Sequence, residues 1–186
     1  MRFIDILVEE HKAVREILDV LDVICKKLQS GERIEPEHIE GIVDFIRNFA
    51  DKAHHMKEED LLFPALEGAG VPRGDMLVEA LTTEHDLGRG YVRGIGDGLI
   101  HYSIGNNSGR LVIRENALKY IELMTRHIDK EEDVIFPLAQ RYLSEAVALE
   151  LAQEFERIDR DVIGDARREE FMSILRMLKE TYLGGS

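Results

Sequence analysis

Apolar side chains recur every three or four residues along most of the chain. This spacing lines one face of an α-helix, so it predicts helices over about residues 3–29, 37–66, 75–101 and 110–142. In the first of these helices the apolar face is formed by Ile4, Leu7, Val8, Val14, Ile17, Leu18, Leu21, Ile24 and Leu28. Pro36 stands near the start of the second helix, where a proline is tolerated. The fold class that we expect is all-α.

Short stretches rich in glycine, proline, serine and asparagine separate the four long helices. They are SGERIEP at residues 30–36, EGAGVPRGD at 67–75 and SIGNNSG at 103–109. Because such short connections join antiparallel neighbours, we expect residues 1–142 to form an antiparallel up-down four-helix bundle. We expect residues 143–186 to form a C-terminal helical extension packed on the bundle, with a break at Gly164 and a frayed tail over residues 184–186.

Two parts of the chain repeat one motif. HHMKEEDLLFP at residues 54–64 matches HIDKEEDVIFP at 127–137, and seven of the thirteen positions from 54 to 66 are identical at an offset of 73. Upstream, EEHKAVR at residues 9–15 matches TEHDLGR at 83–89 at an offset of 74. The first two helices therefore resemble the next two, and two such hairpins predict a pseudo-twofold axis through the bundle.

Helix geometry indicates which polar residues of the repeat face the core. Positions four apart lie about 40° apart around a helix, so His54 and Glu58 point the same way. His55 and Glu59 point about 100° away from them, on the far side of the apolar face. The same test applied to all four helices selects His11, His54, Glu58, His85, His127 and Glu131 as the inward set.

The remaining polar residues of the motif receive weaker expectations. We expect His55 to lie on the surface, and Lys57, Glu59 and Asp60 to lie on a solvated face or behind the inward set. Tyr120 would donate a hydrogen bond to a bound ligand or simply fill the core. For Glu10 and Glu84, which precede inward histidines, both a position behind the inward set and an exposed position stay open. The same holds for Pro64 and Pro137, which either kink or end their helices, and for the glycines at 90, 94 and 98, which either allow close helix packing or form a ligand path or a dimer contact.

Two buried carboxylates need a compensating positive charge. Burying an unpaired carboxylate costs several kcal/mol or shifts its pKa, so we favour two bound cations over metal-free ion pairs. Four imidazoles and two carboxylates, with no thiolate, suit iron, manganese or zinc. A structural zinc site usually closes with four ligands around one ion. We therefore expect two Fe ions, joined by the two glutamates and an oxo or hydroxo bridge, with Mn or Zn as substitutes.

The doubled motif resembles the hemerythrin-like HHE cation-binding family. Its pattern, H…HxxxE…H…HxxxE, is carried by His11, His54, Glu58, His85, His127 and Glu131. The tails EEDLLFP and EEDVIFP strengthen the likeness. FERIDRDVIGDARREEFMSIL at residues 155–175 resembles the C-terminal extension of bacterial and archaeal members. The resemblance covers nearly the whole chain.

One departure from the family bears on function. Hemerythrins that carry oxygen place an HxxxH pair on the third helix and close the set with an aspartate, whereas here Arg89 follows His85 and Glu131 closes the set. A set of four histidines and two glutamates is similar to that of iron-centre repair proteins. The resemblance therefore implies that a small diatomic molecule or a peroxide is bound, sensed or handled, rather than that dioxygen is transported.

Whether the chain is an enzyme stays open, and no catalytic residue stands out. One alternative reduces nitric oxide or peroxide, or donates iron to damaged centres. Another is a regulatory or interaction module that is controlled by the state of the metal. A redox partner and an oligomer are compatible with each of these.

Charge and composition disfavour other classes of partner. The formal net charge of −13 repels phosphate backbones and anionic lipid, so we expect neither nucleic acid nor a membrane. The chain has no run of 18 apolar residues, and MRFIDILVEEHK has too short an apolar stretch for a signal peptide. Cys25, the single cysteine, has no partner for an internal disulfide. We expect a cytoplasmic, reduced protein.

Overall fold

The structure is a computed structural model that describes residues 1–184, and within these residues it contains helices and no strand. The all-α fold class is therefore confirmed. Residues 185 and 186, which belong to the predicted tail and extension, lie outside the described residues. No helix in the described part combines the length and the apolar character that crossing a bilayer requires.

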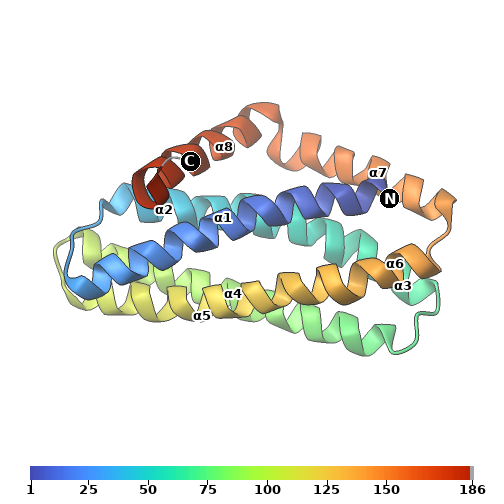
Figure 1. Ribbon diagram of the computed structural model, residues 1–186, viewed down its shortest axis with the longest axis horizontal. Helices are drawn as coiled ribbons and strands as arrows, with labels where there is room; N and C mark the ends of the chain where they lie inside the picture. The colour runs from blue at the N-terminus through green and yellow to red at the C-terminus, as the bar shows by residue number, and fades with distance from the viewer. Residues whose placement is uncertain (185–186) are drawn as a thin grey trace.

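The four predicted helices form at the predicted places. They are α1 (Arg2–Ser30), α2 (Pro36–Phe45) continuing to α3 (Phe63–Gly68), α4 (Gly74–Ser103), and α5 (Ser108–Lys130) continuing to α6 (Phe136–Tyr142). These four rods lie lengthwise beside one another, with α4 and α5 in extensive contact (Figure 1). The boundaries lie within about three residues of the predictions because the apolar periodicity stops where each turn begins.

Wider, π-helical turns interrupt two of the rods. Between α2 and α3 lie η1 (Ile46–His55) and η2 (Glu58–Leu62), and between α5 and α6 lies η3 (Glu131–Ile135). Pro64 and Pro137 are the second residues of α3 and α6, so each helix continues past its proline. A proline lacks the N–H that an α-helical turn requires, and the wide turn ahead of each proline replaces the regular hydrogen-bond ladder there.

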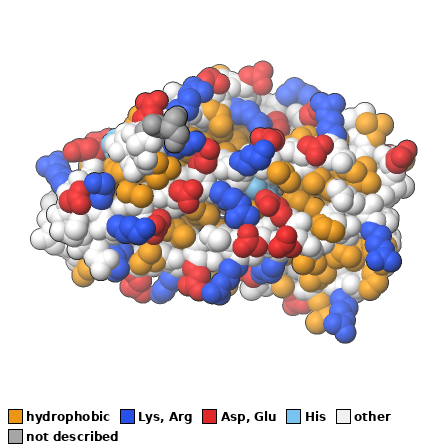
Figure 2. Space-filling view, viewed as in Figure 1, with side chains coloured by type: hydrophobic (Ala, Val, Ile, Leu, Met, Phe, Trp, Pro, Cys, Tyr) orange, Lys and Arg blue, Asp and Glu red, His pale blue; other side chains and the backbone are white. Residues whose placement is uncertain are grey.

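The residues after Tyr142 form two further helices, as predicted. They are α7 (Glu145–Ile158), which runs into η4 (Asp159–Ile163), and α8 (Asp165–Lys179), which runs into η5 (Glu180–Gly184). Gly164 separates them with a φ of 73°, a conformation that a residue without a Cβ adopts readily. α7 and α8 lie on one side of the molecule, over α1 and α2 (Figure 1). On the face of the molecule shown in Figure 2, acidic and basic side chains are interspersed with apolar ones.

Glycines let α4 and α5 approach closely. A Cβ added to Gly98 would lie 2.8 Å from the backbone nitrogen of Ile113, and one added to Gly94 would collide with Asn116. Gly90 has more room, since its nearest neighbour is Arg93 at 3.8 Å. Two of the three glycines predicted to form a stripe therefore serve close helix packing.

Two apolar clusters lie on either side of a polar layer. One cluster gathers buried residues such as Ile17, Phe49 and Ile113, and the other gathers residues such as Phe3, Phe63 and Phe136. The repeat motifs fall between them, so the histidines and glutamates of the motifs are enclosed by apolar packing at both ends.

Candidate metal centre

Seven histidines and glutamates meet in the polar layer. They divide into two groups, His55, Glu58, His85 and His127, and His11, His54, Glu58 and Glu131. Within each group, one nitrogen or oxygen from every residue lies within 4.8 Å of the others, and Glu58 belongs to both groups. Each of the seven residues is at most 4% exposed. The structure therefore brings together the six predicted residues and adds one more histidine.

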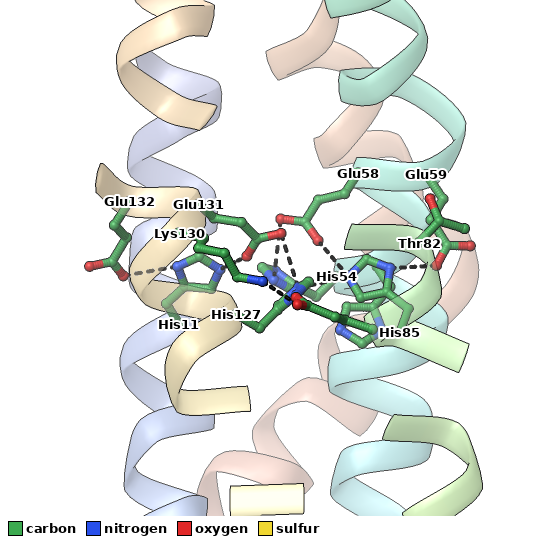
Figure 3. A network of polar contacts seen from close by, with 12 residues as sticks. His11, His54, Glu58, Glu59, Thr82, His85, His127, Lys130, Glu131 and Glu132 are labelled. Carbon is green, nitrogen blue, oxygen red and sulfur yellow. Dashed lines mark hydrogen bonds and ion pairs between the residues drawn. The ribbon is translucent and has the colours of Figure 1, made fainter. Parts of the chain in front are cut away.

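Six helical segments position these side chains, and one of them, η1, carries both His54 and His55. His11 comes from α1, His85 from α4 and His127 from α5. Glu58 and Glu131 occupy the first positions of η2 and η3, which are matching places in the two repeats. Their carboxylates point toward one another among the imidazoles (Figure 3).

Most of the atoms that face the centre lack hydrogen-bond partners. Nε2 of His11, Nε2 of His55 and all four carboxylate oxygens of Glu58 and Glu131 are buried without one. The nearest approaches are ion-pair distances, such as 3.1 Å from His127 Nε2 to Glu131 and 3.2 Å from His11 Nε2 to Glu131. His85 Nε2 and His127 Nε2 lie only 2.9 Å apart. Inward-facing nitrogens and oxygens of this kind, with no thiolate among them, fit cations such as iron, manganese or zinc.

The outer nitrogen of each imidazole contacts a carboxylate. The five Nδ1-to-oxygen pairs are His11–Glu132 at 2.9 Å, His54–Glu10 at 2.9 Å, His55–Asp51 at 3.3 Å, His85–Glu59 at 2.6 Å and His127–Glu84 at 2.9 Å. An ionised carboxylate only accepts hydrogen bonds, so Nδ1 carries the proton and donates it in each pair. Nε2 is then left with a lone pair directed at the centre, which is the tautomer that a metal ligand requires.

A basic side chain in turn neutralises each of these carboxylates. The five ion pairs are Glu132–Arg15, Glu10–Lys57, Asp51–Arg89, Glu59–Arg89 and Glu84–Lys130. Arg89 occupies the place where an oxygen-carrying hemerythrin would have a histidine, and here it orients two carboxylates at 2.8 Å each. The sequence left the positions of Glu10 and Glu84 open, and the structure places both behind the imidazoles.

These contacts repeat at the offsets found in the sequence. The chain His11–Glu132–Arg15 corresponds to His85–Glu59–Arg89, and His54–Glu10–Lys57 corresponds to His127–Glu84–Lys130. Of the second glutamates of KEED, Glu59 takes one of its two expected positions, behind the inward set, whereas Glu132 was not predicted as a histidine partner. The equivalent positions of these two glutamates in the two repeats are the signal that would have found it.

His55 was predicted to lie on the surface, and that prediction is wrong. Its side chain is only 4% exposed, and its ring stacks on that of His85 with centroids 3.7 Å apart. His54 faces the other way, with its ring centroid 4.8 Å from that of His11 on α1. Both residues belong to η1. One side of η1 therefore directs His54 toward α1, and another directs His55 toward α4. The π-helical register of η1 also departs from the regular spacing that the prediction assumed.

His55 breaks the symmetry of the centre. The residue at the equivalent position of the second repeat is Ile128, which is buried in an apolar cluster. Lys57 breaks it too, since it is fully buried against Asp159 while its counterpart Lys130 is exposed. One of the alternatives expected for Lys57, a solvated face, is therefore wrong.

Burial and mutual charge shift the pKa values of these groups. Burial and the neighbouring His11 lower the pKa of His54, and burial and the neighbouring His85 lower that of His55. For His127, burial opposes protonation, but Glu131 and Glu84 prevail and raise the pKa to about 9. Burial and the charge of Glu131 raise the pKa of Glu58. A cation between the two glutamates would let both ionise, so its binding would release protons.

Comparison with known proteins is consistent with this geometry. The family model described as hemerythrin HHE cation binding domain matches residues 2–139. Curated relatives include uncharacterized proteins of Mycobacterium bovis and Mycobacterium tuberculosis, each 24% identical over 160 residues. The match covers 86% of this chain but only 62% of the length of each relative. No solved structure matches the chain.

Proposed function

The chain belongs to the hemerythrin HHE cation-binding family, and from that premise we propose that it is a non-haem di-iron protein that binds, senses or handles a small oxidant. Dioxygen, nitric oxide and peroxide are the candidates. Iron bound at this centre would supply redox chemistry. The proposed ligands are His11, His54, His55, Glu58, His85, His127 and Glu131.

One observation carries the metal assignment. All five imidazoles donate Nδ1–H to a carboxylate, so that in the neutral form of each ring the Nε2 lone pair points toward the two glutamates. Carboxylate–histidine pairs of this kind orient metal ligands and raise their basicity. Five such pairs in a metal-free core would leave inward-facing acceptors without donors, which is an unfavourable arrangement.

The residues around the centre have roles that follow from their contacts. The apolar clusters at both ends restrict access of water. Arg15, Lys57, Arg89 and Lys130 form ion pairs with the outer carboxylates, which accept hydrogen bonds from the imidazoles. Burial raises the pKa of Tyr120, so its hydroxyl keeps its proton and is available as a donor.

The fold proposed for this function is an antiparallel up-down four-helix bundle over residues 1–142, with residues 143–186 as an extension. The contacts repeated at offsets of 73 and 74 support a pseudo-twofold axis that passes between Glu58 and Glu131. The buried, unpaired Cys25 is compatible with the reducing cytoplasm as the location.

Anaerobic reconstitution with ferrous iron tests the proposal. We expect elemental analysis to find two irons per chain, one for each group of ligands. We expect the oxidised protein to show charge-transfer bands that change when azide or nitric oxide is added. A Glu58→Gln variant should lose both the iron and the bands. Iron that binds as tightly to this variant as to the parent protein would refute the assignment.

Control of the C-terminal helices by the metal is a second candidate function, and one chain of contacts favours it. Nδ1 of His54 donates to Glu10, Glu10 pairs with the buried Lys57, and Lys57 lies 2.6 Å from Asp159 of η4. Asp159 in turn lies 3.1 Å from Arg168 of α8. A change in the charge at the centre therefore reaches residues that hold α8 in place.

Tryptic digestion with and without iron tests this second function. If the two are coupled, loading the centre should slow cleavage within α8 several-fold. Asp159→Asn should abolish the difference, while the control Asp161→Asn, at an exposed position next to it, should preserve it. Equal cleavage rates for the iron-loaded and iron-free parent protein would rule out this coupling.

A further inference from the structure

A large pocket opens beside the candidate metal centre. It lies between the α2–η1 rod and α4 and has a volume of about 910 Å³. Its wall reaches His55 and Tyr120, so one end of the pocket adjoins the centre. A volume of roughly 300–1,000 Å³ is typical of sites for small organic ligands. Dioxygen, nitric oxide and peroxide would occupy only a small part of this space.

The wall of the pocket carries charges of both signs. Its four basic residues are Arg47 and Lys52 from η1 and Arg89 and Arg93 from α4. Its acidic residues, Glu37, Glu40, Asp44 and Asp51, all come from the α2–η1 rod. Although the whole protein is strongly acidic, the wall therefore carries as many basic residues as acidic ones.

Three of these basic residues are free to pair with a ligand. Arg89 is engaged with Asp51 and Glu59, but Arg47, Lys52 and Arg93 have no ion-pair partner among residues 1–184. Two acidic residues of the wall are already paired, Asp51 with Arg89 and Asp44 with Arg167. The three free cations are therefore available to an anionic ligand in the pocket.

The position of Arg47 depends on a glycine across the pocket. A Cβ added to Gly96 of α4 would lie 3.1 Å from the guanidinium of Arg47. The side chain of Arg47 therefore crosses from η1 to α4 and lies against the helix at a position without a side chain.

Tyr120 presents an unsatisfied donor at the inner end. Its side chain is 1% exposed, its hydroxyl has no hydrogen-bond partner, and it forms part of the pocket wall. Gly88, also in the wall, makes room for the ring, since a Cβ there would lie 3.4 Å from it. Buried hydroxyls are rarely left without a partner, so this one points to a missing acceptor.

We propose that this pocket binds a small organic carboxylate, held by Arg47, Lys52 and Arg93, whose far end carries an oxygen that accepts from Tyr120. Val43, Ile46 and Val92 form an apolar wall for the body of the ligand. The pocket stands on its own residues, and only the statement that the ligand adjoins a metal rests on the proposed function. The ligand would be placed next to His55.

Calorimetric titration with two probes tests the proposal. The probes are 4-hydroxybenzoate and its neutral isostere 4-hydroxybenzamide, added to protein freed of metal by a chelator. We expect saturable binding of both, with the carboxylate favoured about tenfold because its charge meets the free cations. This preference should shrink as salt is added, since the cations are exposed.

Three variants separate the two recognition elements. Arg47→Gln and Arg93→Gln should weaken only the carboxylate and so reduce its advantage over the amide. Tyr120→Phe should weaken both probes about fivefold, through loss of one hydrogen bond. The matched control is Arg126→Gln, an exposed arginine on α5 that lies outside this pocket and should change nothing. Far-UV circular dichroism and melting curves confirm that each variant is folded.

The outcomes distinguish this inference from the proposed function. Equal affinity for acid and amide, no saturable binding of either, or unchanged binding by Tyr120→Phe would overturn the inference. Iron content measured on the same preparations reports on the metal centre independently. If iron binds and the carboxylate does not, the proposed function holds and the inference about the pocket fails. If the carboxylate binds and iron does not, only the inference about the pocket is supported.

Discussion

Each imidazole of the centre has two distinct sides. Its Nδ1 contacts a carboxylate, and its Nε2 faces the centre. His55 fits this pattern as well as the other four, although it lies at the end of η1 next to His54. Its carboxylate is Asp51, one helical turn earlier, and Arg89 holds that carboxylate. We infer that a residue in this arrangement is a metal ligand rather than a packing residue.

Replacing His55 tests this at the residue scale. We expect His55→Gln to lower iron affinity at least tenfold, because one group of ligands loses a nitrogen donor and Asp51 loses its hydrogen-bond donor. Competitive titration with a chelator of known affinity measures the change. His101→Gln, which replaces an exposed histidine on α4, is the control and should bind iron normally. Unchanged affinity in His55→Gln would return this residue to a packing role.

Glu10 and Glu84 occupy matching positions in different surroundings. Glu10→Gln and Glu84→Gln should each lower iron affinity about 10- to 100-fold, because each weakens the partner of a ligating histidine. Only Glu10→Gln should also destabilise the fold, by about 3 kcal/mol, since it removes a charge partner from the fully buried Lys57. Lys130, the corresponding partner of Glu84, is exposed. Urea unfolding of the metal-free variants compares them, and equal losses of stability would contradict the assigned role of Lys57.

At the scale of the elements, the π-helical segments and the α4–α5 contact determine where the candidate ligands lie. η2 and η3 begin with the two inward glutamates and end just before the Phe-Pro steps, in both repeats. The same local sequence thus produces the same local distortion twice. α4 brings His85 to the centre because it lies close against α5. Gly98 and Gly109, which have no Cβ, allow this close approach.

Adding a methyl group at this contact should separate the two helices. We expect Gly98→Ala to destabilise the protein by about 1–3 kcal/mol, since the new Cβ would lie 2.8 Å from a backbone nitrogen that has nowhere to move. Gly68→Ala is the matched control, because nothing lies within 4 Å of a Cβ there. The free energy of unfolding in urea measures both. A loss no greater at 98 than at 68 would show that the contact is not tight.

At the scale of the whole molecule, the buried titratable groups make stability depend on pH. Burial lowers the pKa values of His54, His55 and His85 below the value of about 6.5 in an unfolded chain. Below pH 6.5 the unfolded chain therefore binds protons that the native protein does not, and stability falls as pH falls. The raised pKa of Glu58 keeps one proton on the native protein. This offsets only one of the three protons that the histidines of the unfolded chain bind.

Above pH 6.5 the sign reverses. His127 keeps its proton to about pH 9 in the native protein but loses it near 6.5 when unfolded, so stability falls as pH rises. We expect the metal-free protein to be most stable near pH 6.5, with slopes of about 1.4 kcal/mol per pH unit for each proton involved. Urea unfolding between pH 5.5 and 9 in the presence of a chelator measures this. His127→Gln should flatten the alkaline side, and a profile with no maximum would show that these groups are not buried as described.

The sequence alone determined the four long helices, the two repeats and six of the seven residues of the centre. It could do so because helix formation and the facing of side chains depend on neighbours three or four residues away, which periodicity records directly. The two repeats also checked each other, since the same positions fell inward in both. The pairing of His54 with Glu58 and of His127 with Glu131 needed nothing beyond this local spacing.

Only the tertiary structure decided the rest. His55 is buried because its rod lies between α1 and α4, and Lys57 is buried because Asp159, a hundred and two residues later, packs over it. The carboxylate that each histidine contacts comes from another helix in four of the five pairs. Contacts between segments distant in the chain leave no periodic trace in the sequence, since they arise from how whole helices pack rather than from the conformation of any one of them.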